Sequence, residues 1–123
     1  KGSKLPLINY KSNILKAIAI INKKKLGIGI IIKNKMAFGI VTDGDIRRGT
    51  KKISKRNKIN SLMTTKPLYI GESTPASKAM SIMSEKKITS LLVSSDKDFI
   101  RKKSSFKPIG ILHIHSLLKY GIK

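Results

Sequence analysis

The fold is decided by residues 39–48, GIVTDGDIRR. Gly39 to Val41 form a short apolar run that is typical of a buried strand. Thr42 or Asp43 can cap a helix by accepting a hydrogen bond at a side-chain oxygen. Ile46 would then be the first apolar residue of that helix. We therefore predict a strand that runs directly into a helix over residues 43–48.

Such a corner has two functional interpretations. Where a strand feeds a helix start, free backbone N–H groups and a partial positive charge meet, which favours an anion such as a phosphate. The Thr42 hydroxyl can donate to a phosphate oxygen, and the Asp45 carboxylate can accept from two ribose hydroxyls. The alternative is that Thr42 and Asp45 only cap the helix.

The first half of the chain predicts the order strand, helix, strand, strand, helix. A lead-in strand at residues 5–8 contains Pro6, which suits an edge strand or a strand start. Apolar residues at helical spacing predict a helix over 13–24, with Ser12 as its cap. The apolar stretches 27–32 and 37–41 predict strands around a turn at 33–35.

The second half starts the same order again after a polar linker at residues 49–58. We expect a helical turn at 59–63, a strand at 67–70, and a helix that ends near Lys86 and is capped by Ser73 or Thr74. A strand at 90–94, a charged loop at 95–107, a strand at 109–113 and a closing helix at 116–120 follow.

The two halves also match in sequence. Lys16-Ala17 recurs as Lys78-Ala79, and Gly39-Ile40 recurs as Gly110-Ile111. The spacing grows from 62 to 71 residues between these matches, so the strand–strand loop of the second half is nine residues longer. We predict two packed units, residues 1–56 with the linker and residues 57–123, related by a pseudo-twofold axis.

Composition narrows the functional classes. The 123 residues carry a net charge of +21 and contain no cysteine. Charge of this sign favours nucleic acid or an anionic membrane, but nearly all the cations are lysines and aromatic residues are few, whereas base recognition favours arginine and stacking. We therefore do not expect a nucleic acid partner. Nucleic acid binding driven by the charge stays an alternative to the functions considered below.

No segment looks like a membrane span or a signal peptide. No apolar run approaches the roughly 20 residues that a spanning helix needs, and the N-terminus lacks the apolar core of a signal peptide. We expect no membrane partner and a cytoplasmic location. Because the chain starts without methionine, we also expect it to be part of a longer protein.

A resemblance to a known family emerges from the second half. Its pattern of apolar and small residues consists of Met63-Thr64, Pro67, Ile70, Ala79-Met80, Met83, Ile88, Leu91-Leu92-Val93 and Gly110-Ile111-Leu112. This pattern resembles a cystathionine-β-synthase (CBS) domain, and the first half matches closely from Gly39 onward. The resemblance implies an α/β (α+β) fold, a tandem CBS pair of two β-α-β-β-α repeats with clefts between them.

The resemblance extends to one enzyme family. Thr42 to Arg48, together with the Leu-His-Ile-His string at residues 112–115, is similar to the C-terminal region of bacterial arabinose 5-phosphate isomerases. In that family a sugar-isomerase (SIS) domain precedes the CBS pair and converts ribulose 5-phosphate to arabinose 5-phosphate for Kdo and lipopolysaccharide synthesis. The SIS domain is missing from this chain, so we expect an isomerase in the parent protein and none in the fragment.

The resemblance also implies a regulatory role. A nucleotide, either an adenine nucleotide or CMP-Kdo, would bind in the cleft between the repeats, and the module would form homodimers by CBS–CBS stacking within a tetrameric enzyme. The alternatives are a structural CBS scaffold that binds no ligand and the CBS module of another protein. No cofactor is expected.

The candidate ligand-binding residues are Thr42, Asp45, Arg47, His113 and Ser116, and we expect no catalytic or metal-binding residues. Arg47 and the neighbouring Arg48 could hold a phosphate, or could form a solvated helix face. His113 and Ser116 stand where Thr42 and Asp45 stand in the first repeat, so we expect one working cleft. The other carboxylates, Glu72, Glu85, Asp96 and Asp98, are expected to be solvated.

Overall fold

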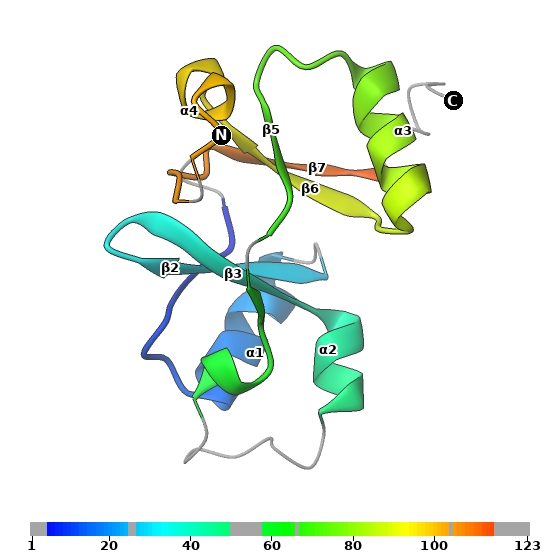
Figure 1. Cartoon of the computed structure of the whole chain (residues 1–123). Helices are drawn as coiled ribbons and strands as arrows, with labels where there is room; N and C mark the ends of the chain where they lie inside the picture. Colours follow the sequence, from blue (N-terminus) through cyan, green and yellow to red (C-terminus); the bar gives the residue numbers. More distant parts are fainter. Residues whose placement is uncertain (1–4, 25–26, 50–57, 66, 104, 115–123) are drawn as a thin grey trace. The chain divides into compact units, whose positions relative to one another are not determined.

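The computed structural model describes residues 5–24, 27–49, 58–65, 67–103 and 105–114. The chain forms two compact units, one of residues 3–67 and the other made mainly of residues 68–123. We call them the first unit and the second unit. Figure 1 shows the elements of both along the chain.

The first unit follows the predicted order. Its four-stranded sheet has the order β1-β2-β3-β4, in which β1 pairs with β2 in parallel and the other neighbours are antiparallel. Its elements are β1 (Leu7–Asn9), α1 (Ile14–Lys24), β2 (Ile28–Lys33), β3 (Met36–Thr42), α2 (Asp43–Arg48), the 3₁₀ turn η3 (Ile59–Ser61) and β4 (Thr64–Thr65).

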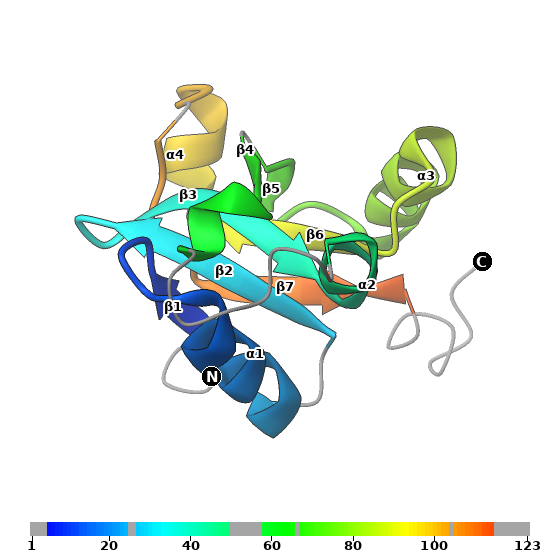
Figure 2. The same ribbon diagram turned by 90° about the horizontal axis from the view of Figure 1, so that it is seen from below.

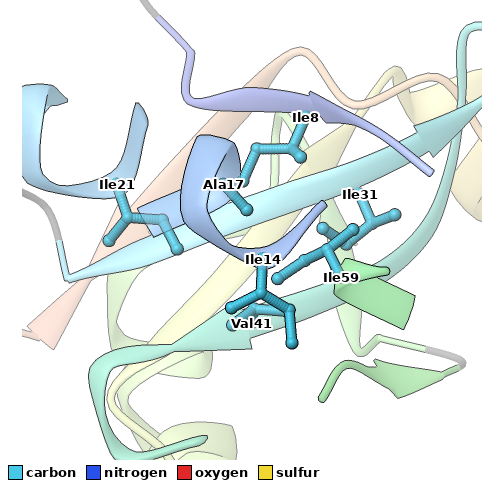
Figure 3. Close-up of a cluster of buried hydrophobic side chains, with 7 residues drawn as sticks. All are labelled: Ile8, Ile14, Ala17, Ile21, Ile31, Val41 and Ile59. Atoms are coloured by element: carbon cyan, nitrogen blue, oxygen red, sulfur yellow. The ribbon is translucent and has the colours of Figure 1, made fainter. Parts of the chain in front are cut away.

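The core of the first unit lies between α1 and one face of the sheet. Ile14, Ala17 and Ile21 recur at helical spacing along α1 and are buried against the strands. Figures 2 and 3 show α1 alongside β1 and β2 and the buried cluster that they share. The members of this cluster are Ile8, Ile14, Ala17, Ile21, Ile31, Val41 and Ile59.

The start of α1 corrects one prediction. The expected cap, Ser12, was wrong, because the Oδ1 atom of Asn13 accepts a hydrogen bond from the backbone N–H of Lys16 at 2.9 Å. An asparagine side chain satisfies a helix start in the same way as a serine. The cap therefore lies one residue later than predicted.

The second unit repeats the order with one additional helix. Its sheet has the order β5-β6-β7, with β5 and β6 parallel and β6 and β7 antiparallel. Its elements are β5 (Tyr69–Gly71), α3 (Ala76–Lys86), β6 (Ser90–Ser94), α4 (Asp96–Ile100) and β7 (Gly110–His113). The closing helix predicted at 116–120 lies outside the described residues.

Two local predictions in the second unit were wrong. The N-cap position of α3 is Pro75, without a side-chain cap, so neither Ser73 nor Thr74 caps this helix. The region 95–107 is not only a loop, because it contains α4, whose cap is the Ser95 hydroxyl accepting from the Asp98 N–H. Ala79 and Met83 lie on one face of α3 and are buried with Ile70 and Leu91.

The strand pairings confirm the internal repeat. The β1–β2 and β2–β3 pairings of the first unit have counterparts in the second at the offsets found in the sequence, 62 residues before the strand–strand loop and 71 after it. The equivalent pairs are Leu7–Ile30 and Tyr69–Leu92 in parallel, and Ile28–Thr42 and Ser90–His113 in antiparallel arrangement.

The division into units differs from the sequence boundary in one respect. Ile59, Leu62 and Met63, which the sequence repeat assigns to the second half, pack in the core of the first unit. The strand β4 likewise pairs with β3. The repeat boundary at residues 56 and 57 stays a prediction about the duplicated sequence, since residues 50–57 are not described.

Candidate functional site

The corner between β3 and α2 forms as the sequence predicts. The Asp45 N–H donates to the Thr42 Oγ1 atom at 3.2 Å, and the Thr42 N–H donates to the Asp45 Oδ2 atom at 2.9 Å. This reciprocal pair is a capping box, which satisfies two backbone donors that a helix start leaves unpaired. Thr42 and Asp45 therefore do cap α2, and the capping box leaves the Thr42 hydroxyl proton available for donation. Ligand binding by the same two side chains stays a prediction.

Arg48 forms an ion pair with this corner. Its Nη2 atom lies 2.7 Å from the Asp45 Oδ1 atom, so both carboxylate oxygens of Asp45 have partners. Arg47, the predicted site residue, and Arg48 are both exposed, and a role of Arg47 in the site stays a prediction. The i,i+3 spacing from Asp45 to Arg48 is the signal that could have selected Arg48 over its neighbour.

The register of the sheet shows which face Thr42 occupies. Cross-strand partners share a face, so Thr42 lies on the same face as Ile28. The preceding residue Val41 is buried in the cluster that packs on α1. Because side chains alternate along a strand, Thr42 belongs to the sheet face opposite α1.

His113 holds the equivalent place in the second unit. It is the last residue of β7, pairs with Ser90, and lies half-buried on the face opposite α3. The next backbone N–H, that of Ile114, donates to the Thr89 carbonyl at 2.8 Å, as the Asp43 N–H does to the Gly27 carbonyl at 3.0 Å. Ser116, the other predicted residue of this corner, lies outside the described residues.

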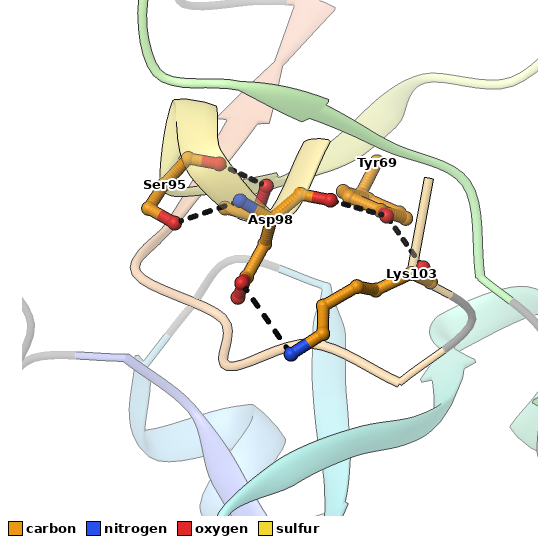
Figure 4. A network of polar contacts seen from close by, with 5 residues as sticks. Tyr69, Ser95, Asp98 and Lys103 are labelled. Atoms are coloured by element: carbon orange, nitrogen blue, oxygen red, sulfur yellow. Dashed lines mark hydrogen bonds and ion pairs between the residues drawn. The ribbon is translucent and has the colours of Figure 1, made fainter. Parts of the chain in front are cut away.

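A second polar group, which the sequence did not predict, surrounds the additional helix α4. Figure 4 shows its central contacts. The Tyr69 hydroxyl donates to the carbonyl of Lys103, and the Asp98 carboxylate lies 3.9 Å from the Lys103 ammonium group. The Tyr69 ring stacks on Phe106 and meets Phe99 edge-on. Burial, and then the negative charge of Asp98, raise the pKa of the Tyr69 phenol.

Asp96 ties α4 to the segment before α3. Its two carboxylate oxygens accept from the backbone N–H of Ser73 at 2.9 Å and from the Ser73 hydroxyl at 2.5 Å. These hydrogen bonds, the hydroxyl first, lower the pKa of the Asp96 carboxyl. The sequence predicted that Asp96 is only solvated, and this prediction was wrong for Asp96. The contacts of Tyr69, Asp96 and Asp98 hold α4 and the residues that follow it, which we call the inserted segment (residues 95–103). We therefore assign these polar contacts a structural role.

The described residues offer no metal site and no membrane span. Among them, no three histidine, cysteine, aspartate or glutamate side chains gather as metal ligands would. No helix in the described part of the chain has the length and apolar character needed to cross a bilayer.

Comparison with known sequences supports the expected enzyme resemblance. Arabinose 5-phosphate isomerase KdsD of Francisella tularensis is 31% identical in an alignment that covers 100% of this chain and 36% of that protein. KdsD of an Escherichia coli strain is 30% identical over 98% of this chain and 35% of that protein. An uncharacterized Rickettsia prowazekii protein is 34% identical over 98% and 35%, respectively. The chain thus spans about a third of the length of these relatives.

Solved structures with the same fold carry CBS domains. CBSX2 in complex with AMP superposes with a TM-score of 0.75 at 25% identity, over 97% of this chain and 88% of that one. The CBS-domain protein ATU1752 of Agrobacterium tumefaciens gives a TM-score of 0.78 at 17% identity, over 96% and 90%. The family model described as CBS domain matches residues 59–123. Together with the duplicated strand pairings, this match shows that the chain belongs to the CBS-domain family.

Proposed function

We propose that this chain is the regulatory CBS module of an arabinose 5-phosphate isomerase and that it senses an adenine nucleotide at the corner of Thr42 and Asp45. The observation that carries the proposal is the Thr42–Asp45 corner itself, a hydroxyl and a carboxylate held at fixed positions by a capping box. The similarity to KdsD proteins over the whole chain supports the isomerase role of the parent protein.

The chemistry of the corner fits a ribose phosphate. A hydroxyl that accepts from the backbone still has its proton for a phosphate oxygen, and a carboxylate can accept from a vicinal diol. The AMP complex of CBSX2, at 25% identity, supports an adenine nucleotide as the ligand class. CMP-Kdo, a product further along the route that the isomerase would feed, is the second candidate.

Regulation would act through populations of enzyme conformations. A nucleotide shifts the attached catalytic domains only if it binds one arrangement of the modules more tightly than another. We propose that the parent enzyme is a cytoplasmic tetramer in lipopolysaccharide synthesis, that the modules pair as homodimers, and that the ligand binds between the repeats.

A structural scaffold is the competing function. The corner is already a complete capping box without any ligand, and both oxygens of Asp45 have protein partners. A module of this kind would hold the oligomer together and bind no nucleotide. The scaffold function predicts a concentration-dependent dimer in sedimentation experiments and no change in thermal stability when nucleotides are added.

Thermal melting separates the two functions. A ligand at about 100 times its dissociation constant stabilises the folded state by roughly 2.7 kcal/mol, which moves the midpoint by several degrees. We expect AMP or ATP at millimolar concentration to give this shift in the wild type and to lose it in Asp45→Asn. Asp43→Asn, an exposed carboxylate two residues away, is the matched control and should keep the shift. Unchanged melts with AMP, ATP and CMP-Kdo would favour the scaffold.

A further inference from the structure

Two neighbouring apolar side chains are exposed on the inserted segment. Ile100, the last residue of α4, is 75% exposed, and the preceding Phe99 is 40% exposed. Phe99 is held in place, because its ring meets that of Tyr69 edge-on at 5.9 Å between the centroids. Single exposed apolar residues are common on protein surfaces, but apolar side chains rimmed by charged ones are typical of an interaction surface.

The charged rim of this apolar pair is cationic. The basic residues of the inserted segment are all exposed and lie within three residues of Ile100; they are Lys97, Arg101, Lys102 and Lys103. Lysine and arginine side chains keep their charge in water while their carbon stems cover apolar surface. The inserted segment thus combines an apolar centre with positive charge around it.

The two carboxylates of the inserted segment have partners within the fold. Asp96 accepts two hydrogen bonds from Ser73, and Asp98 lies 3.9 Å from the Lys103 ammonium group (Figure 4). In the described part of the chain, the other three cations of the segment have no carboxylate within ion-pair distance. Their charge is therefore available to an anionic partner.

We propose that the inserted segment docks on an anionic lipid surface, with Phe99 and Ile100 in the headgroup region and the cations on the lipid phosphates. Apolar and cationic side chains together bind a segment to the plane of a bilayer surface. From the sequence we expected no membrane partner, because it shows neither a spanning segment nor a signal peptide, and a surface contact requires neither. Lipid binding at this segment is independent of the nucleotide site.

Other anionic partners fit the segment less well. Nucleic acid would use the cations, but bases stack on aromatic side chains, which leaves the exposed Ile100 without a role. A specific protein interface buries about 800 Å² on each partner, whereas the inserted segment offers two exposed large apolar side chains. A bilayer surface needs no matching shape, so a small apolar pair with surrounding cations is sufficient for it.

The test is cosedimentation of the 123-residue chain with vesicles of phosphatidylcholine and phosphatidylglycerol in equal parts. We expect Ile100→Ser to weaken binding about fivefold or more, because the variant loses the apolar surface that enters the bilayer. Leu15 is the matched control, since it is 41% exposed on α1, outside the inserted segment. Leu15→Ser should stay within about twofold of the wild type.

Two lysines separate this contact from a general effect of charge. Lys102 and Lys87 are both exposed and both have a left-handed backbone, with φ of 53° and 57°. Lys87 precedes β6, whereas Lys102 follows α4. Lys102→Gln should weaken binding about fivefold, which is the usual contribution of one cation at an anionic bilayer, and Lys87→Gln should change it less than about twofold.

Tryptophan fluorescence locates the contact, because the chain contains no tryptophan of its own. In Ile100→Trp the emission should shift to shorter wavelength on vesicles with phosphatidylglycerol, since the indole ring enters the headgroup region. In Leu15→Trp the emission should not change. Ile100→Trp keeps an apolar side chain, so its emission decides the question even if Ile100→Ser does not fold.

Three results would overturn the lipid contact. They are a wild type that does not bind the vesicles, an Ile100→Ser variant that binds as the wild type does, and equal losses in Lys102→Gln and Lys87→Gln. Binding to single-stranded RNA or to polyglutamate that Ile100→Ser weakens, without binding to vesicles, would also overturn it and would assign the segment to nucleic acid or to an acidic protein.

Discussion

Thr42 and Asp45 hold each other through two reciprocal hydrogen bonds, each from the backbone N–H of one to the side chain of the other. Removing the hydroxyl in Thr42→Ala should lower the free energy of unfolding by about 1 kcal/mol, the usual cost of losing such a cap. Urea unfolding measures this loss. Thr42→Ser keeps the oxygen and should stay close to the wild type, and equal stability of the alanine and serine variants would contradict the capping role.

Gly29 lets α1 approach the sheet. A Cβ atom there would lie 2.5 Å from Ile8 Cδ1 and 3.0 Å from Ile21 Cγ1, and both side chains belong to the buried cluster of the first unit. We expect Gly29→Ala to lower the free energy of unfolding by about 1–3 kcal/mol, as overpacking of a core does. Denaturant unfolding provides the measurement.

Gly110 in β7 is the matched control for that substitution. A Cβ atom there would meet nothing nearer than Val93 Cβ at 3.6 Å, which is an ordinary contact. Gly110→Ala should therefore change the free energy of unfolding by about 0.5 kcal/mol or less. Equal losses in the two alanine variants would show that crowding does not decide the effect.

The Ser73–Asp96 contact should make the stability of the fold depend on pH in the acidic range. The hydrogen bonds from Ser73 lower the folded-state pKa of the Asp96 carboxyl below its ordinary value of 3.8. Such a group stabilises the fold fully above its unfolded pKa, and the contribution is lost as the pH falls through the folded pKa. The wild type should thus melt above Ser73→Ala at neutral pH, and the gap should narrow below about pH 4. A gap that stays constant from pH 7 to 3 would contradict this linkage.

Tyr69 should hold the inserted segment in place. Its ring stacks on Phe106, and its hydroxyl donates to the Lys103 carbonyl. In Tyr69→Ala both contacts are lost, so trypsin should cleave after Arg101 and Lys102 faster than in the wild type. Tyr69→Phe keeps the ring contacts and should cut at an intermediate rate, whereas equal cleavage of all three proteins would show that Tyr69 does not anchor the segment.

Local patterns predicted most of the elements. The helix at 43–48 and the strand at 90–94 were predicted with the bounds that the structure has, because a cap motif and an apolar run are both readable within a few residues. The offsets of the sequence repeat, 62 and 71 residues, recur in the equivalent strand pairs. The same reasoning missed α4, although Ser95 and Asp98 have the spacing of Thr42 and Asp45, since the surrounding charges suggested a loop.

Contacts distant in sequence were not predictable in this way. Nothing near Ser73 indicates that it binds Asp96, 23 residues later, instead of capping α3. Similarly, the burial of Ile59 in the core of the first unit depends on packing against α1 and the sheet.

The most direct test of the nucleotide site is a titration of the ¹⁵N-labelled chain with AMP, followed by the backbone amide resonances. The backbone amides of Thr42 and Asp45 donate to the side chains of the capping box, so their chemical environment changes when a ligand binds these side chains. The account predicts that the amide resonances of Thr42, Gly44 and Asp45 shift most and saturate together, and that those of Ser73 and Asp98 stay in place. A spectrum that does not change at millimolar AMP, or shifts confined to the α4 segment, would contradict it.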